Sequence, residues 1–420
     1  MRFIYTLLVY ALLPRALWHL LWRARRQPAY LEHIPERFGY YRQPAEQPLI
    51  WVHAVSVGET RAAEPLIRAL QREYPQHRIL LTHMTPTGRE AGEALYGDTV
   101  LRCYLPYDYP GAVAHFLDHF RPRVGVLMET EVWSNLIHAC RERRIPLYLV
   151  NARLSEKSFE KYRRFAELTR ASLGELTAVA AQTADDAQRL AALGAENAVI
   201  AGNLKFDIEL PVAQLKLGEA WRRRYGESRP VLLAASTRDG EEDLLLSRLG
   251  ALEAPFALLV IVPRHPQRFD AVAALIERHG IRYQRRSREE PVAPDTRVVL
   301  GDSMGEMFAY YAACDVAFIG GSLLPFGGQN LIEACAAGKP VLFGPHTYNF
   351  AEAAEGAIAA GAALRVADAD ELMRKAQQLL TDAGAAARMG EAGRAFGKAH
   401  QGATRRVMEL IRWSGAMSDG

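Results

Sequence analysis

Short apolar runs alternate with helix-forming segments along most of this chain, and the alternation occurs twice. The first series covers residues 49 to about 205, and a second series starts near residue 231. Buried strands that alternate with helices form parallel sheets covered on both faces. The chain has 420 residues, which is too long for one ordinary hydrophobic core. The sequence therefore predicts an α/β fold with two Rossmann-like, doubly wound domains.

The predicted strands are short apolar runs that end at polar turns. In the first half they are Leu49–His53, Arg78–Thr82, Arg123–Met128, Leu147–Val150, Ala178–Ala181 and Ala198–Ala201. In the second half they are Val231–Ala234, Phe256–Val262, Val298–Leu300, Asp315–Ile319 and Pro340–Phe343. Helices are expected over Thr60–Tyr74 and Val132–Arg143. The polar stretch Lys216–Arg229 separates the halves, so we expect domains at 27–215 and 216–420.

Residues 1–26 precede this pattern and have a different character. An apolar run from Phe3 to Leu13 is interrupted at Pro14 and Arg15 and then resumes. Residues 1–42 contain seven arginines and two glutamates, although the whole chain has a net charge of only +3. Positive charge beside an apolar segment is typical of a membrane-associated helix rather than a nucleic-acid-binding region. We predict that residues 1–26 anchor the protein to a membrane; the alternative is an amphipathic helix packed on the protein's own surface.

Several kinds of site are disfavoured by the motifs that are missing. The four cysteines show neither a zinc-ligand spacing nor a disulfide framework. The chain has no phosphate-binding P-loop and no H-E-x-x-H sequence. One Asp-x-Asp occurs at Asp368–Asp370, where Asp is expected to cap a helix that begins near Glu371. The sequence therefore predicts no bound metal and no cofactor.

Polar turns that follow the predicted strands of the first half provide candidate catalytic groups. Glu59 opens a helix, where the helix dipole favours an ionised carboxylate that can accept a proton. Ser56 precedes it by three residues, so Glu59 can equally complete a capping box. Glu129 follows the strand at 123–128 and can likewise cap a helix. Lys205 ends the first half, where a solvated surface charge is the alternative to a role in the site.

Three turns of the second half have features that suit an anionic sugar nucleotide. Arg264 follows a strand and can bind a phosphate or a carboxylate. Ser303–Glu306 is expected to begin a helix whose backbone N–H groups can face an anion. A glycine-rich turn, residues 320–328, allows close backbone approach to a ligand. Asn330 and Glu333 follow it and are expected on one face of a helix.

A basic segment, Asn151–Phe165, has five Lys or Arg residues against two Glu. Such a segment can meet anionic lipid headgroups or the phosphates of an acceptor. A solvated helix face explains the same pattern, and both interpretations stay open.

An ordered set of motifs resembles the 3-deoxy-D-manno-octulosonic acid (Kdo) transferases over nearly the whole chain. The motifs are Glu36-Arg37-Phe38-Gly39, Val57-Gly58-Glu59, Met84-Thr85-Pro86-Thr87-Gly88, Glu129-Thr130-Glu131-Val132-Trp133, Asn151-Ala152-Arg153-Leu154-Ser155, Gly202-Asn203-Leu204-Lys205-Phe206-Asp207 and Pro263-Arg264-His265-Pro266. Two positions depart from the family pattern: Ser134 stands where Pro is usual, and Gln329 replaces a His.

The resemblance implies a GT-B fold, with two Rossmann-like domains and a cleft between them, and an N-terminal membrane-anchor helix. It also implies an inverting transfer from CMP-Kdo to a lipid A precursor (lipid IVA) at the cytoplasmic face of the inner membrane, beside its phospholipid. By motif, Glu59 corresponds to the general base, and Glu129 and Lys205 to positions that assist the transition state. The positions that correspond to the CMP-binding turns are Pro263, Arg264, Met304, Gly305, Glu306, Asn330, Leu331, Ile332 and Glu333.

Other functions of the same fold class remain alternatives at this point. A GT-B transferase that uses a UDP-sugar on a lipid acceptor is one, and a sugar-nucleotide epimerase is another. The apolar segment at residues 1–26 disfavours the epimerase, which needs no membrane anchor. A nucleotide-binding membrane protein without turnover is disfavoured because Glu59 accompanies a complete set of donor-binding turns.

Overall fold

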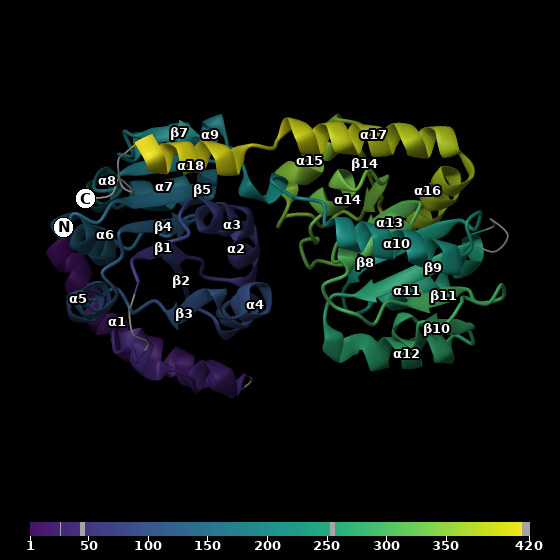
Figure 1. Ribbon diagram of the computed structural model, residues 1–420, viewed down its shortest axis with the longest axis horizontal. Helices are drawn as coiled ribbons and strands as arrows, with labels where there is room; N and C mark the ends of the chain where they lie inside the picture. The colour runs from purple at the N-terminus through teal and green to yellow at the C-terminus, as the bar shows by residue number, and fades with distance from the viewer. Residues whose placement is uncertain (26, 43–46, 253–256, 414–420) are drawn as a thin grey trace. The chain divides into compact units, whose positions relative to one another are not determined.

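The computed structural model describes residues 1–25, 27–42, 47–252 and 257–413, which form two compact units. The first unit contains Met1–Asp207 and Gln401–Gly420, and the second contains Ile208–His400. Each unit is built on one parallel, seven-stranded sheet (Figure 1). The predicted α/β class with two doubly wound sheets is confirmed.

The first sheet has the strand order β3-β2-β1-β4-β5-β6-β7. Its strands are β1 Leu49–His53, β2 Arg78–His83, β3 Val100–Tyr104, β4 Val124–Met128, β5 Leu147–Ala152, β6 Ala178–Ala181 and β7 Ala198–Ile200. The helices of this unit are α1 Arg2–Ala24, α2 Val57–Ala62, α3 Glu64–Glu73, α4 Pro86–Tyr96, α5 Pro110–Phe120, α6 Ser134–Glu142, α7 Glu156–Arg163, α8 Ala166–Gly174, α9 Ala184–Ala192 and α18 Ala403–Trp413.

The second sheet has the order β10-β11-β9-β8-β12-β13-β14. Its strands are β8 Val231–Thr237, β9 Leu258–Pro263, β10 Tyr283–Arg285, β11 Val298–Leu300, β12 Val316–Ile319, β13 Val341–Phe343 and β14 Ala363–Arg365. The helices of this unit are α10 Val212–Tyr225, α11 Glu241–Ser247, α12 Phe269–Arg278, α13 Met307–Ala313, α14 Ile332–Ala336, α15 Ala351–Ala359, α16 Ala369–Thr381 and α17 Ala383–Ala399.

Both faces of the first sheet are covered, which explains why its strands are continuous apolar runs. Along β1, Ile50 and Val52 belong to one buried cluster, and Leu49 and Trp51 belong to another. Successive side chains of a strand point to opposite faces, so these clusters lie on the two sides of the sheet. The sheet therefore presents mainly the ends of its strands to solvent and ligands.

The strands that the sequence pattern did not reveal are β3, β10 and β14, and each lies at the edge of its sheet. Edge strands are only partly covered and contain polar residues, as in Tyr283-Gln284-Arg285 of β10. The predicted helix Thr60–Tyr74 is divided in the structure at Ala63, just before Pro65 in the first turn of α3. Phe256, where one strand was expected to begin, lies outside the described residues.

The limits of the two units differ from the expected 215/216 boundary. The polar stretch Lys216–Arg229, which was expected to separate the halves, lies largely within α10, and α10 packs against α13. Gly218 of α10 is so close to α13 that a Cβ there would lie 2.4 Å from the carbonyl oxygen of Ala309. Helix α10 therefore belongs to the second unit.

The C-terminal helix α18 returns to the first unit. Val407 and Ile411 join the buried cluster that contains Leu66 of α3, and Arg406 donates to the carbonyl oxygen of Ala201 at 2.7 Å. The carboxylate of Asp207 accepts from the backbone N–H of Gly402 at 2.5 Å. This long-range packing leaves no local signal in the sequence.

Helix α1 is continuous through Pro14 and is joined to the first unit through its N-terminal half. Tyr5 donates to the carboxylate of Asp108 at 2.7 Å, and Thr6 donates to the side-chain oxygen of Asn135 at 2.9 Å. The rings of Tyr10 and Tyr109 lie 5.4 Å apart. The helix is therefore attached to α6 and to the turn that precedes α5.

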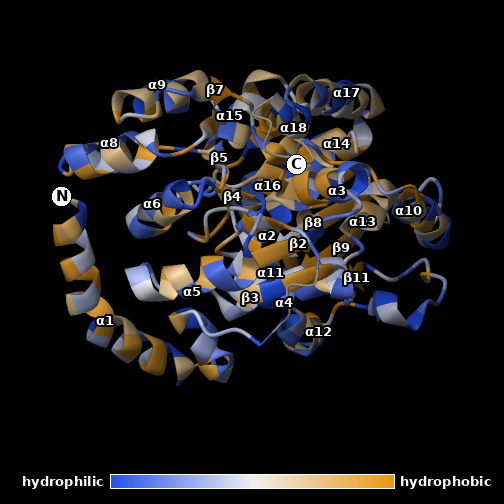
Figure 2. Cartoon of the chain, turned by 60° about the vertical axis from the view of Figure 1, so that its left-hand side comes forward, coloured by the Kyte–Doolittle hydropathy of each residue, from blue (hydrophilic) through white to orange (hydrophobic). Residues whose placement is uncertain are grey.

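Apolar residues predominate along α1 (Figure 2), and many of them are exposed. Its exposed large apolar side chains are Phe3, Ile4, Leu7, Leu8, Tyr10, Leu12, Trp18, Leu21 and Trp22. In the described part of the chain, α1 alone is long and apolar enough to cross a membrane, a test that N-terminal signal sequences also pass.

Candidate active site

The proposed catalytic residues of the first unit flank the point where its strand order reverses. From β1 the chain proceeds to β2 and β3 on one side and then to β4 on the other. In doubly wound sheets, ligands bind at this switch point, beyond the carboxyl ends of the strands. Glu59 follows β1 and Glu129 follows β4, so the fold brings the two carboxylates to the same end of adjacent strands.

Glu59 is held by the turn that begins α2. Its carboxylate accepts from the backbone N–H of Val55 at 2.6 Å and from the hydroxyl of Ser56 at 3.1 Å. Ser56 is the N-cap residue, and its side chain accepts from the N–H of Glu59. The capping interpretation is therefore confirmed for Ser56, and Glu59 is fixed in position by the same turn.

Burial is the main reason why the pKa of Glu59 rises to about 7. The nearby carboxylates of Glu129 and Glu131 raise it further, against the lowering effect of the bonds from Val55 and Ser56. A carboxylate with this pKa exchanges a proton near neutral pH, as a general base requires. Geometry and environment thus allow Glu59 to act as a base as well as to stabilise the turn.

Two histidines lie behind this turn, and both are buried. Desolvation lowers the pKa of His53 to about 3 and that of His83 to about 4, so both rings are neutral at pH 7. One ring nitrogen of His83 contacts the carbonyl oxygen of Ala54 at 2.9 Å. His83 therefore supports the turn and does not compete with Glu59 as a proton acceptor.

Glu129 and Lys205, which are far apart in the sequence, form an ion pair of 3.2 Å. The backbone of Glu129 has a φ of +60°, a left-handed conformation that costs energy for a residue with a side chain. Lys205 lies in the short helix η4, Leu204–Phe206, which contacts α2. Lys205 and the turn of Glu59 are therefore neighbours in the first unit.

Polar residues from β5, from the end of β6 and from the start of η4 itself fix the position of η4. The side chain of Asn151 accepts from the N–H of Leu204 at 3.0 Å, and that of Asn203 accepts from the N–H of Lys205 at 3.0 Å. Gln182 donates to the backbone carbonyl of Asn151 at 2.9 Å. Gln182 is missing from the sequence-based site, because nothing in its local sequence indicates this contact.

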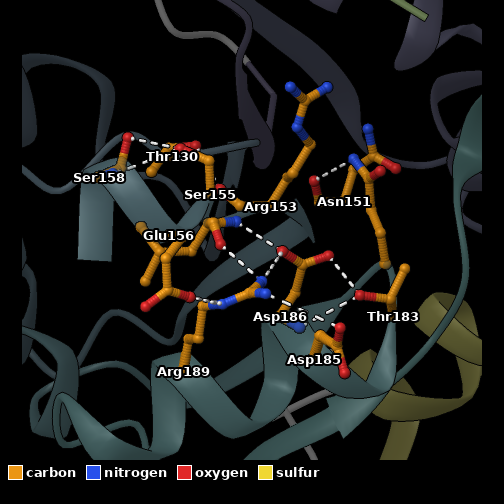
Figure 3. Close-up of polar contacts among 12 residues, drawn as sticks. Thr130, Asn151, Arg153, Ser155, Glu156, Ser158, Thr183, Asp185, Asp186 and Arg189 are labelled. Carbon is orange, nitrogen blue, oxygen red and sulfur yellow. Dashed lines mark hydrogen bonds and ion pairs between the residues drawn. The ribbon is translucent and has the colours of Figure 1, made fainter. Parts of the chain in front are cut away.

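The basic segment that starts at Asn151 is connected to the turn of Glu129 and to α9 (Figure 3). Thr130 donates to the carbonyl oxygen of Arg153 at 2.7 Å, and Asp186 accepts from the N–H of Leu154 at 2.7 Å. Arg189 pairs with Glu156 at 3.1 Å. Figure 3 shows the side chain of Arg153 extending away from this network, and Arg153 is exposed.

In the second unit, the structure places Pro263 at the end of β9 and Arg264 directly after it. The N–H of Arg264 donates to the carbonyl oxygen of Thr237 at 3.0 Å. This bond joins the turn after β9 to the end of β8, the neighbouring strand. Arg264 is thus held at the carboxyl end of the sheet, as expected.

The expected helix start at Ser303–Glu306 is wrong, because α13 begins at Met307. Ser303 does not cap a helix; its hydroxyl bonds to that of Tyr310 at 2.7 Å. Glu306 pairs with Arg286 at 2.7 Å, and Met304 is exposed. Arg286, which is distant in the sequence, therefore positions Glu306. The Ser-x-x-Glu pattern of Ser303 and Glu306 does not reveal this ion pair.

Asn330 and Glu333 lie together, but not on one face of a helix as expected, because α14 begins at Ile332 and Asn330 precedes it. The side-chain amide of Asn330 donates to Glu333 at 3.0 Å, and its oxygen accepts from the N–H of Ile332 at 3.0 Å. Leu331 and Ile332 are buried and hold this turn on the unit.

Asp368 caps α16 by accepting from the N–H of Glu371 at 2.8 Å, which confirms the capping interpretation.

Two family profiles match the chain. Residues 32–208 match the profile described as 3-deoxy-D-manno-octulosonic-acid transferase (kdotransferase), and residues 280–396 match glycosyl transferases group 1. A 3-deoxy-D-manno-octulosonic acid transferase of Bordetella pertussis is 48% identical over 99% of this chain and 100% of its own length. The transferase of that name from Haemophilus influenzae is 38% identical over 98% of each chain.

Solved structures with low sequence identity share the fold. A glycosyltransferase from Rickettsia africae covers 89% of this chain and 100% of its own, with a TM-score of 0.59 at 16% identity. A UDP-GlcNAc 2-epimerase from Neisseria meningitidis covers 87% and 100%, with a TM-score of 0.59 at 17% identity. Because both transferases and epimerases have this GT-B-like architecture, the fold alone does not distinguish between these activities.

Proposed function

The chain belongs to the 3-deoxy-D-manno-octulosonic acid transferase family, and from this premise we propose that it transfers Kdo from CMP-Kdo to the lipid A precursor in lipopolysaccharide core biosynthesis. The relatives match along nearly their whole length, so the activity in their names applies to a protein of this size and organisation. The UDP-sugar transferase and the epimerase share only the fold with this chain. Both are therefore less well supported.

The observation that carries the mechanism is the placement of Glu59 at the switch point of the first sheet with a pKa of about 7. In the reaction, a hydroxyl oxygen of the acceptor forms a bond to the anomeric carbon of Kdo. The bond from that carbon to the phosphate oxygen of CMP breaks, and CMP leaves with both bonding electrons. Glu59 takes the proton of the hydroxyl, which makes the oxygen a better nucleophile.

Glu129 and Lys205 have a supporting role in this proposal. The negative charge of Glu129 helps to keep the pKa of Glu59 high, and Lys205 partly balances that charge at 3.2 Å. A fixed ion pair beside the reacting groups can also stabilise charge that develops in the transition state. The ion pair therefore influences the pKa of Glu59 and the stability of the transition state.

The donor is assigned to the turns of the second unit. Arg264 can neutralise the phosphate of CMP, while Asn330 and Glu333 offer hydrogen-bonding groups to its nucleoside. A nucleoside monophosphate carries less charge than a diphosphate, so these groups can stabilise the leaving group without a divalent ion. Activity is thus expected to be independent of metal.

We further propose that α1 attaches the protein to the cytoplasmic face of the inner membrane, where the lipid acceptor resides. Its exposed apolar side chains support this assignment, as does the arginine cluster that follows Trp22. Binding of phospholipid by α1 would keep the first unit beside the lipid acceptor.

The direct test is to incubate the purified protein with CMP-Kdo and lipid IVA and to measure product masses. A mass increase of one or more Kdo units, undiminished in EDTA, is the expected result. Parallel incubations with UDP-sugars are the control. A product that forms only from a UDP-sugar, or turnover that EDTA abolishes and magnesium restores, would contradict the proposal.

A further inference from the structure

The second sheet has its own switch point, between β8 and β12. From β8 the chain proceeds to β9, β10 and β11 on one side and then to β12 on the other. The turn after β8 starts at Arg238, and the turn after β12 starts at Gly320. Ligands of doubly wound sheets bind at this position. Neither the family motifs nor the predicted site includes Arg238.

One buried carboxylate joins these two turns. Glu241 is fully buried and accepts from the backbone N–H groups of Arg238 at 2.9 Å and Gly321 at 2.6 Å. It also accepts from those of Ser322 and Leu323, both at 2.9 Å. Four hydrogen bonds to one carboxylate fix the backbone on both sides of the switch point. The position of Arg238 relative to the glycine-rich turn is therefore well defined.

The side chain of Arg238 extends along the glycine-rich turn. Its guanidinium carbon lies 4.7 Å from the ring centre of Phe326. A Cβ added to Gly321 would be 3.3 Å from Cγ of Arg238 and 3.1 Å from the amide nitrogen of Gln329. Glycine at 321 leaves room for Arg238 and Gln329 to lie side by side. Their nitrogen atoms are both hydrogen-bond donors.

Arg238 and Arg264 occupy equivalent positions, because each directly follows one of two neighbouring strands. Thr237 of β8 pairs with Pro263 of β9, so the next residues, Arg238 and Arg264, leave the sheet together. Adjacent strands are about 5 Å apart. Both arginines, with Arg268, lower the pKa of His265, although desolvation is the larger cause. Three arginines therefore lie near His265.

Arg268 and Arg238 differ in their ion pairs. Arg268 pairs with Glu242 at 2.6 Å and with Asp239 at 2.9 Å. Arg238 takes part in none of the ion pairs found among residues 1–25, 27–42, 47–252 and 257–413. The carboxylate of Glu241, which lies in the same turn, is occupied by backbone N–H groups. The guanidinium of Arg238 is therefore available to an anion that binds at this switch point.

We propose that Arg238 binds the carboxylate of the donor sugar, next to the phosphate at Arg264. The inference rests on the proposed function. In CMP-Kdo, the carboxylate and the phosphate are both attached to the anomeric carbon, so the donor presents two anions side by side. Two arginines at the same level of adjacent strands match that arrangement. Arginine suits a carboxylate because its planar guanidinium can donate two parallel hydrogen bonds.

The test compares the KM for CMP-Kdo with the inhibition constant of CMP, which lacks the sugar carboxylate. In Arg238→Gln, the KM for CMP-Kdo should rise about 10- to 100-fold, as expected for loss of a charged hydrogen bond, while CMP inhibits as in the wild type. The KM of Arg238→Lys for CMP-Kdo should lie between those of the wild type and Arg238→Gln, because lysine keeps the charge but not the planar fork. Arg264→Gln should weaken both CMP-Kdo and CMP.

Arg248→Gln is the matched control, because Arg248 pairs with Asp370 on the exposed surface of the same unit. It should change neither constant, and thermal melting verifies that each variant is folded. If Arg238→Gln weakens CMP and CMP-Kdo equally, Arg238 binds the phosphate and the inference is wrong. Unchanged constants would also overturn it. Failure of the proposed function would look different, since the wild type would then not use CMP-Kdo.

Discussion

Glu59 combines a structural and a chemical property in one side chain. Its carboxylate accepts from the backbone N–H of Val55 at 2.6 Å and so stabilises the turn that begins α2. Burial nevertheless raises its pKa to about 7. A residue used only for capping would gain nothing from a pKa near neutrality, whereas a general base requires one. The charges around Glu59 should therefore control the pH dependence of the reaction.

The acid limb of the pH–rate profile tests whether these charges set the pKa of Glu59. A base is active when unprotonated, so the rate should rise with pH and reach half its maximum at about pH 7. Glu129→Gln removes a negative charge that raises the pKa of Glu59, so the limb should move to lower pH. Lys205→Met leaves Glu129 uncompensated, so the limb should move to higher pH. Each shift should be roughly one pH unit.

The control for these variants is Lys216→Met, which removes an exposed lysine of the second unit. Its profile should match that of the wild type. If the acid limb moves in the same direction in Glu129→Gln and Lys205→Met, it does not report the titration of Glu59 beside these two charges.

The sequence revealed the residues at the strand ends but not the partners that position them. Glu59, Glu129 and Arg264 were predictable because functional groups follow the strands of parallel sheets. The ion pair of Glu306 with Arg286 and the location of Arg238 depend on which strands become neighbours. No local pattern encodes strand order, so these contacts became visible only in the folded chain.

Among the elements, α6 connects the turn of Glu129 to helix α1. Asp108 is buried, and its carboxylate accepts from the N–H groups of Asn135 at 3.1 Å and Leu136 at 2.8 Å. The same carboxylate accepts from the hydroxyl of Tyr5 in α1. Helix α6 follows the turn of Glu129–Trp133 directly. Asp108 should thus stabilise both the helix start and the attachment of α1.

Asp108→Asn tests this role at the scale of the element. An amide offers one acceptor oxygen, and its NH2 group would face a backbone N–H that then lacks a partner. We expect the free energy of unfolding of the first unit to fall by about 2–3 kcal/mol. Denaturant unfolding followed by tryptophan fluorescence measures it. Asp118→Asn, which removes an exposed pair with Arg143, should cost less than about 1 kcal/mol. Equal losses in the two variants would contradict the role of Asp108.

The sequence predicted buried central elements better than edge elements. Val298–Leu300 and Ala178–Ala181 match β11 and β6, because buried parallel strands form continuous apolar runs. The edge strand β10 has a polar sequence and was missed. The docking of α18 on α3 could not be predicted, because it depends on contacts more than 300 residues apart, such as Arg412 with Glu73.

At the scale of the whole molecule, α1 should determine where the protein resides. Removal of residues 1–26 should move most of the protein from the membrane pellet to the soluble fraction, because the exposed apolar surface of α1 is lost. Replacement of Trp18, Leu21 and Trp22 by serine should act in the same direction. Fractionation by centrifugation in low and high salt provides the measurement.

A triple serine variant of exposed apolar residues in the second unit, Val212, Leu244 and Leu364, is the matched control. It should pellet with membranes as the wild type does. If the folded, truncated protein still sediments fully with membranes in high salt, another surface anchors the chain.

The measurement that tests the central claim most directly is the initial rate of Glu59→Gln with CMP-Kdo and lipid IVA. Glutamine can still accept from the N–H of Val55, so the turn should persist and stability should change by no more than about 1 kcal/mol. It cannot accept the proton of the acceptor hydroxyl. The account predicts a rate lower by roughly 100- to 10,000-fold, with unchanged inhibition by CMP. A stable Glu59→Gln protein with near-normal turnover would contradict it and leave Glu129 as the next carboxylate to test.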